Sequence, residues 1–350
     1  MFIERMETLL QNTAVEAAYI TSPENLRYYS GFTGEEAVLI IQKGTYMLFT
    51  DSRYVLQATR EATDCKVVDI VETTAVTYLA KQAPGVIGFE EEHINAKKYR
   101  ALCSALPNSS WQGVDGTIIQ QRSIKNEKEL ELTRKAATLA DAAFAHVLPL
   151  IKPGISERDI ALELDWHMRK NGADGPSFPI ICASGLRSAM PHGVATDKKL
   201  APGDLITLDF GCFYQGYASD MTRTVVLGKA TDEQKKIYNT VLKAQEAALN
   251  MIGPNVACKD ADAAARGVIT NQGYGSNFGH SLGHGTGLVI HEQPVLSPRS
   301  DMVLAPGMTV TVEPGIYVES LGGVRIEDLI IITKNGYENL THSPKGLLEL

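Results

Sequence analysis

The sequence has no apolar run long enough to cross a membrane and no excess of positive charge. Its 350 residues carry a formal net charge of −8, which argues against a nucleic-acid-binding protein that works by neutralising phosphates. The opening segment MFIERMETLL lacks the apolar centre of a secretory signal and has the pattern of an amphipathic helix. We therefore expect neither a membrane partner nor a nucleic-acid partner.

Paired cysteines are also absent. The five cysteines are scattered, and none belongs to a Cys-x-x-Cys pair, which favours buried reduced thiols and a cytoplasmic protein. Hydrophobic residues make up 44% and charged residues 21% of the chain, as in an ordinary globular protein. The length allows two domains with separate cores.

The first 122 residues alternate between strand and helix patterns and contain no glycine-rich phosphate loop, which predicts an α/β domain. The segment SPENLRYYSGFTG, at 22–34, is expected to be a loop that is either plain surface or reaches a substrate. A domain boundary is expected near 122–126, so the second domain covers 123–350. Strands are predicted at 15–20, 37–41, 46–50, 66–71 and 86–89, and helices at 54–62, 74–82 and 96–106.

The second domain contains one sequence motif twice. LAPGDLITLDFG occupies 200–211 and LAPGMTVTVEPG occupies 304–315, so that Asp209 in the first copy falls on Glu313 in the second. Each copy begins with a Pro-Gly turn and continues as an alternating strand. Equivalent carboxylates therefore end equivalent strands in two halves of one fold.

Each of these carboxylates is followed by another. Asp220 comes after Asp209, Glu327 comes after Glu313, and glycines lie between the members of each pair, as expected for a chain that turns back in a hairpin. Four carboxylates would then meet near a pseudo-two-fold axis, where they would repel one another. Divalent metal is the simplest source of the positive charge that such a cluster needs.

Helices are expected in equivalent places of both halves. Ser156 with Asp159 and Thr231 with Gln234 have the spacing of capping boxes, which start two of these helices. The second domain is thus predicted to be a doubled fold that encloses its ligand between its halves. The expected helices cover 127–151, 156–170, 231–251 and 260–272.

Three histidines lie in the segment GHSLGHGTGLVIHEQP, at 279–294. Its glycines make a helix improbable. In an extended segment His280 and His284 would lie roughly 13 Å apart, too far to bind one ion. One of them should therefore bind metal while the other faces the substrate.

Taken together, the motifs LDFG, SDMTRT, GHGTG, VEPGIY and GGVRIED, with PHG upstream, resemble the metallopeptidase family with the "pita-bread" fold. That family includes methionine aminopeptidases, aminopeptidase P and prolidase. The N-terminal domain resembles the creatinase-like domain of the Xaa-Pro branch. The resemblance implies an α/β (α+β) protein whose catalytic domain has a pseudo-two-fold repeat.

The resemblance also implies a two-metal centre. Asp220 and Glu327 would bridge the ions, Asp209 would bind one, and His284 with Glu313 would bind the other. Oxygen ligands with one imidazole suit Mn, with Co or Zn as alternatives, at a separation of roughly 3.5–4 Å. A shared water that loses its proton near neutral pH would be the nucleophile.

The same resemblance assigns the catalytic side chains. His291 would hydrogen-bond the scissile carbonyl, and His192 and His280 would shape the pocket around proline and assist proton transfer. Glu313 would carry a proton from the attacking water to the leaving nitrogen. Arg325 shares a strand face with Glu327 and would orient the acidic ligands.

We expect hydrolysis of the bond between an N-terminal residue and a following proline, by a homodimer. Dipeptide-specific relatives often place an arginine just after their HE-P motif, where this chain has Val295, so an aminopeptidase P-like enzyme is favoured. The alternative is a strict dipeptidase (prolidase), with Arg187 or Arg299 holding the substrate carboxylate. A non-catalytic peptide-binding module is a remote alternative, since all five metal ligands are present.

Overall fold

The computed structural model describes all 350 residues, which divide into two compact units, Met1–Arg122 and Ser123–Leu350. Each unit has its own hydrophobic core. No helix combines the length and the apolar character that crossing a membrane requires.

Unit 1 is built on a six-stranded mixed sheet in the order β4-β3-β2-β1-β5-β6. The central strand β1 pairs antiparallel with β2 and parallel with β5. The strands are β1 (Ala17–Ile20), β2 (Ala37–Gln42), β3 (Thr45–Thr50), β4 (Lys66–Asp69), β5 (Val86–Phe89) and β6 (Ser110–Gly113). The helices are α1 (Phe2–Thr13), α2 (Pro23–Ser30), α3 (Val55–Glu61), α4 (Ala75–Gln82), α5 (Ala96–Ala105) and α6 (Asp115–Ser123).

The expectation of a loop at 22–34 was wrong, because most of this segment is the helix α2. Ser22 caps the helix by accepting a hydrogen bond from the N–H of Asn25, and Pro23 occupies the first turn. Gly31 ends it with φ of 79°, a conformation that glycine adopts without strain. These start and stop signals outweigh the aromatic and polar composition on which the expectation rested.

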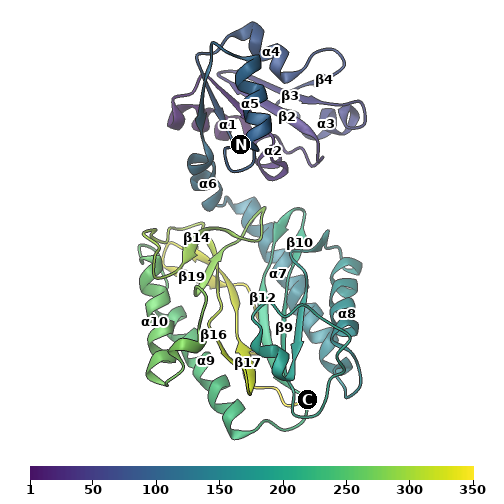
Figure 1. Ribbon diagram of the computed structural model, residues 1–350, viewed down its shortest axis with the longest axis vertical. Helices are drawn as coiled ribbons and strands as arrows, with labels where there is room; N and C mark the ends of the chain where they lie inside the picture. Colours follow the sequence, from purple (N-terminus) through teal and green to yellow (C-terminus); the bar gives the residue numbers. More distant parts are fainter. The chain divides into compact units, whose positions relative to one another are not determined.

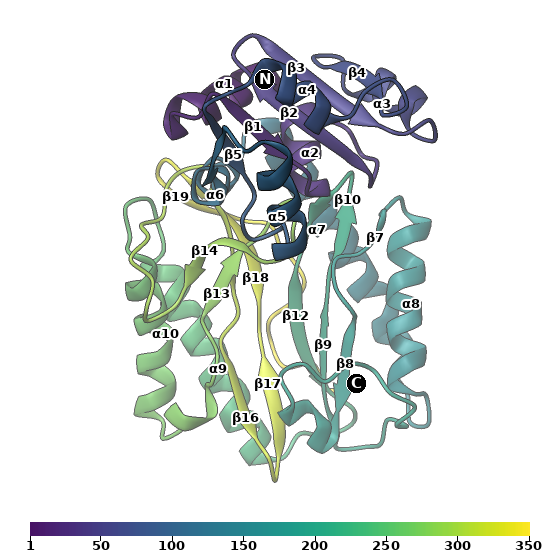
Figure 2. The same cartoon turned by 45° about the horizontal axis from the view of Figure 1, so that its top comes forward.

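Unit 2 places its helices outside and its strands inside (Figures 1 and 2). The helices α7 and α8 lie on one outer side, and α9 and α10 lie on the other. The helices are α7 (Glu127–Val147), η1 (Leu148–Leu150), α8 (Glu157–Lys170), η2 (Gly185–Ala189), α9 (Asp232–Met251), α10 (Cys258–Asn271) and η3 (Gly275–Asn277). Both predicted capping boxes, at Ser156 and Thr231, are present.

The strands of unit 2 form a three-stranded sheet β12-β9-β8, a five-stranded sheet β14-β13-β15-β18-β19 and two smaller sheets, β11-β10-β7 and β16-β17. They are β7 (Gly175–Pro176), β8 (Ile181–Ser184), β9 (Leu205–Phe210), β10 (Cys212–Tyr214), β11 (Tyr217–Ala218), β12 (Met221–Val226), β13 (Gly283–Gly285), β14 (Glu292–Leu296), β15 (Thr309–Val312), β16 (Gly315–Val318), β17 (Gly322–Arg325), β18 (Asp328–Thr333) and β19 (Gly336–Asn339).

The repeated sequence motif, at 200–211 and 304–315, forms equivalent strand pairs in the two halves. In the first half β9 pairs antiparallel with β12, so that Asp209 faces Thr222 across the ladder. In the second half β15 pairs antiparallel with β18, with Val312 opposite Asp328. Each of these strand pairs packs against its own helices through a large apolar core. The helices are α7 and α8 in the first half and α9 and α10 in the second. The predicted fold class, a mixed α/β protein with a doubled C-terminal domain, is confirmed.

Candidate metal centre

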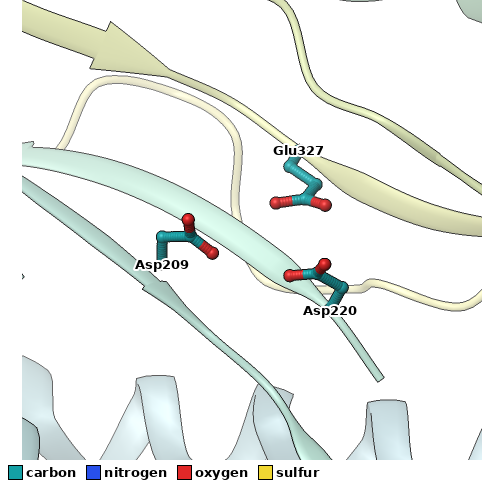
Figure 3. Close-up of side chains that lie close together, drawn as sticks. All are labelled: Asp209, Asp220 and Glu327. Carbon is teal, nitrogen blue, oxygen red and sulfur yellow. The ribbon is translucent and has the colours of Figure 1, made fainter. Parts of the chain in front are cut away.

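Three buried carboxylates, contributed by both halves, lie close together near the ends of strands β9, β12 and β18 (Figure 3). Asp209 ends β9, Asp220 precedes β12, and Glu327 lies just before β18. Their ligand atoms all lie within 4.8 Å of one another, and the residues are 8%, 5% and 1% exposed. Acids this close and this buried require a compensating positive charge.

The protein itself supplies only part of that compensation. One oxygen of each acid, namely Oδ1 of Asp209, Oδ1 of Asp220 and Oε1 of Glu327, is buried and has no hydrogen-bond partner. Burial, followed by the charges of neighbouring acids, raises the pKa of Asp220 and of Glu327 well above the ordinary value. Unpaired oxygens of hard carboxylate ligands, aimed at one another, fit divalent metal ions.

His284 and Glu313 lie beside this cluster. The Nε2 atom of His284 is 3.4 Å from Oε1 of Glu313 and 3.6 Å from Oδ2 of Asp220. Burial lowers the pKa of His284, and its Nδ1–H donates to the carbonyl of Gly285 at 3.0 Å. The imidazole is therefore neutral, with the Nε2 lone pair directed at the acids, as a metal ligand requires.

The glycines around His284 allow its strand to approach two neighbours closely. A Cβ atom at Gly283 would lie 2.0 Å from the carbonyl oxygen of Thr311, and one at Gly285 would lie 2.3 Å from that of Gln293. Any larger residue would push β13 away from β14 or β15. The GHG pattern is thus a packing requirement that holds the histidine at the acids.

Glu313 has the environment of a group that exchanges protons. Burial is the main cause that raises the pKa of its carboxyl to about 7. Its Oε1 accepts a hydrogen bond from the hydroxyl of Thr311 at 3.1 Å, which fixes its orientation toward His284. The neutral form of this carboxyl is thus favoured by burial, and a cation beside it would favour the ionised form.

Arg325 contacts Asp209 directly and Glu327 through a threonine hydroxyl. Its Nη2 donates to Oδ2 of Asp209 at 2.5 Å, and its Nε donates to the hydroxyl of Thr222 at 3.1 Å. That hydroxyl in turn donates to Oε2 of Glu327 at 2.6 Å. Thr222 was not among the predicted site residues, although two-residue alternation from Asp220 into β12 places both side chains on the same face.

The three histidines predicted to contact the substrate, His192, His280 and His291, lie outside the carboxylate cluster. His280 is held through Nε2 by the hydroxyl of Tyr317 at 2.9 Å and donates from Nδ1 to the carbonyl of Ser281 at 2.8 Å. Its burial lowers its pKa to about 4, so it is a neutral imidazole. His291 is exposed, with its ring centroid 4.3 Å from that of His284.

His192 is exposed in the loop that follows η2. Burial is the main cause of the lowered pKa of His280 and of His291, and the charge of His192 lowers both further. It therefore lies within electrostatic range of the other two histidines. The structure thus brings the residues predicted to bind metal and those predicted to contact substrate into one region of unit 2.

Comparisons with known proteins identify the family of both units. Residues 131–334 match metallopeptidase family M24, and residues 3–124 match the creatinase/prolidase N-terminal domain. An Xaa-Pro dipeptidase of Pyrococcus horikoshii is 37% identical over 99% of this chain and 98% of its own length. The resemblance inferred from the motifs is confirmed.

Solved structures are similar along the whole chain. An Xaa-Pro dipeptidase from Bacillus anthracis has a TM-score of 0.96 and 44% identity, over 100% of this chain and 99% of that one. An X-Pro aminopeptidase from Thermotoga maritima has a TM-score of 0.91 and 39% identity, over 99% of this chain and 100% of that one. Both units of the chain therefore have counterparts in single enzymes.

Proposed function

Because this chain belongs to metallopeptidase family M24, and is thus a metal-dependent peptidase, we propose that it cleaves the bond between an N-terminal residue and a following proline. The observation that carries the proposal is the convergence of Asp209, Asp220 and Glu327, with His284 and Glu313 beside them. Relatives named Xaa-Pro dipeptidase and X-Pro aminopeptidase support the choice of proline.

We propose two divalent ions as the cofactor, Mn first and Co or Zn as alternatives. Asp220 and Glu327 would hold both ions, Asp209 would complete one, and His284 with Glu313 would complete the other. Ions held there would polarise the scissile carbonyl and lower the pKa of the attacking water. The unpaired oxygens of the three clustered acids support this assignment.

The surrounding side chains would handle the proton and the substrate. Glu313 would accept the proton of the attacking water and pass it to the leaving nitrogen. His291, exposed beside His284, would donate to the oxyanion that develops on the carbonyl. His192 and His280 would contact the proline and its flanking atoms.

Proline suits a site of this kind. The amide that precedes proline has no N–H, so an enzyme that recognises that hydrogen binds the bond poorly. A site that acts on the carbonyl and on the leaving nitrogen, through side chains and cations, does not need that hydrogen.

We favour peptides longer than dipeptides. Position 295 pairs with His284 across the β13–β14 ladder, and the side chain there is the apolar valine. Arg187 donates to Glu157 and to the carbonyl of Val194, which leaves it engaged away from a substrate carboxylate. Arg299 is exposed on the surface and remains the candidate for a dipeptidase, a function that the names of several relatives favour.

A peptide-length series tests this choice. We expect cleavage before proline in both Gly-Pro and Gly-Pro-Gly, with kcat/KM for the tripeptide at least equal to that for the dipeptide, and no cleavage of Gly-Ala-Gly. Val295→Arg should raise kcat/KM for Gly-Pro about 10- to 100-fold, because one charge-assisted hydrogen bond to the substrate carboxylate contributes about 1.5–3 kcal/mol. Product analysis by liquid chromatography measures both.

Val295→Leu, which adds volume without charge, is the matched control for that substitution. Cleavage of the dipeptide alone would overturn our preference and leave the prolidase function. Rapid cleavage of Met-Ala peptides would point to a different M24 activity.

We further propose that the enzyme acts as a homodimer in the cytoplasm. Its five cysteines form no disulfide, which supports a reducing compartment. We also propose that residues 123–350 form the catalytic domain and that residues 1–122 form a separate N-terminal α/β domain; the two compact units have these bounds.

A further inference from the structure

The segment that carries His280 belongs to no helix or strand, yet its backbone is held at three points by one helix. The segment runs from 278 to 282, between η3 and β13. Arg266 of α10 donates to the carbonyl of Phe278 at 2.9 Å and to the carbonyl of His280 at 2.8 Å. Asp262 accepts from the N–H of Leu282 at 3.1 Å.

Asp262 and Arg266 form a rigid pair. Two parallel hydrogen bonds join them, Nε to Oδ2 at 2.7 Å and Nη2 to Oδ1 at 2.8 Å, in the bidentate geometry that is strongest for this kind of pair. Asp262 is 1% exposed. The guanidinium also lies over the ring of Phe278, 4.2 Å from its centroid. Every polar group of the pair therefore faces the segment or the partner.

The imidazole of His280 depends on this support. The hydroxyl of Tyr317 engages one ring nitrogen and the carbonyl of Ser281 the other, so the position of the ring is set jointly by Tyr317 and by the backbone that Arg266 holds. We propose that Arg266, fixed by Asp262, is a positioning residue that holds His280 in place at the substrate. This inference rests on the proposed function, in which His280 contacts the substrate.

The packing of α10 does not need the pair. Its apolar face is buried in the core of the second half, independently of Arg266. Loss of the guanidinium should therefore leave the helix in place and loosen mainly residues 278–281, because the backbone of Leu282 keeps its hydrogen bonds with Leu296 and Glu313. The buried apolar residues of the helix are Cys258, Ala261, Ala265 and Ile269.

Arg266→Met keeps the length of the side chain and removes its donors. We expect kcat/KM for an Xaa-Pro peptide to fall about 10- to 100-fold, the cost of displacing a substrate-contacting group by about 1 Å. Bound metal should stay at the wild-type level. Arg266→Lys should recover only part of the loss, because an ammonium lacks the planar fork that reaches Asp262 and two carbonyls together.

The chain offers a matched control in the other half. Arg169 of α8 pairs with Asp165 through the same i,i+4 spacing at 2.8 Å and donates to the carbonyl of Asp174 at 2.8 Å. No predicted site residue lies in the segment that it holds. Arg169→Met should therefore change kcat/KM less than twofold.

Two measurements decide the inference. In a His280→Ala background, Arg266→Met should have little further effect on kcat/KM, whereas independent losses that multiply would overturn the positioning role. Hydrogen–deuterium exchange should quicken in the peptide covering 278–283 in Arg266→Met alone, and unchanged exchange would also overturn it. A wild-type protein that cleaves no Xaa-Pro peptide would contradict the proposed function, and the exchange result would still judge the positioning of the segment.

Discussion

Asp220→Asn should leave the purified protein without its full complement of divalent metal and should lower kcat/KM about 10³-fold or more. Asp220 is one of two acids proposed to hold both ions, and its Oδ1 has no partner in the protein. An amide carries no charge and is a weak ligand, so the several kcal/mol that the ions contribute to the transition state would be lost. Elemental analysis after gel filtration and steady-state kinetics on Gly-Pro-Gly measure the two losses. Glu327→Gln should behave in the same way.

Loss of folding is a rival explanation of such a result, and the melting temperature separates the two. Burial, with the charge of Glu327, raises the pKa of Asp220, so its ionised form costs stability once metal is removed. Metal-free Asp220→Asn should therefore melt at or above the temperature of metal-free wild type at pH 8. Glu319→Gln is the control, because Glu319 is an exposed carboxylate between β16 and β17 and should leave metal and activity unchanged. A fully active Asp220→Asn enzyme would refute the assignment.

Glu313→Gln should lower kcat by about 10²- to 10⁴-fold, the usual contribution of a positioned general acid or base. The amide keeps the shape of the side chain and its hydrogen bond from Thr311 but cannot carry a proton. The Asp209, Asp220 and Glu327 cluster remains intact in this variant, so at least one ion should still bind, although Glu313 is one of the two residues proposed to complete the second ion. Kinetics measured beside metal content distinguish this loss from that of Asp220→Asn.

Thr311→Val is the matched control for Glu313. It removes the hydroxyl that donates to the carboxylate and accepts from the backbone N–H of His284, and it leaves the carboxylate itself. We expect kcat to fall about 10- to 100-fold, as for the loss of one hydrogen bond to a charged group, and by less than in Glu313→Gln. If Glu313→Gln retained wild-type kcat with metal bound, the proton would have to travel by another residue, and the proposed role of Glu313 would be wrong.

The acids could be predicted because their positions follow from local rules. Strand alternation, the Pro-Gly turns and the repeat place Asp209 and Glu313 equivalently, and hairpins return Asp220 and Glu327 close to their strand partners. The distance between His280 and His284 along an extended segment separated their roles. In the structure only His284 lies against the acids.

The supporting residues could not be predicted in the same way. Asp262 and Arg266 have the i,i+4 spacing of an ordinary surface pair on a helix, and nothing in the sequence indicates that the backbone of 278–282 packs against them. The aromatic and polar composition of residues 22–34 favoured a loop, whereas Ser22 with Pro23 at the start and Gly31 at the end are the signals of the helix α2. Hydrophobic periodicity in the sequence indicates neither the tertiary contacts of the Asp262–Arg266 pair nor the caps that begin and end α2.

The central claim is that acids from the two halves of unit 2 bind a pair of cations on which peptide hydrolysis depends. Its most direct measurement is to strip the wild-type protein of metal, dialyse it against increasing Mn²⁺, and record bound metal and turnover of Gly-Pro-Gly on the same samples. The account predicts no turnover without metal and full turnover when two ions are bound per chain. Full turnover by the metal-free protein, or binding that saturates without restoring activity, would contradict it.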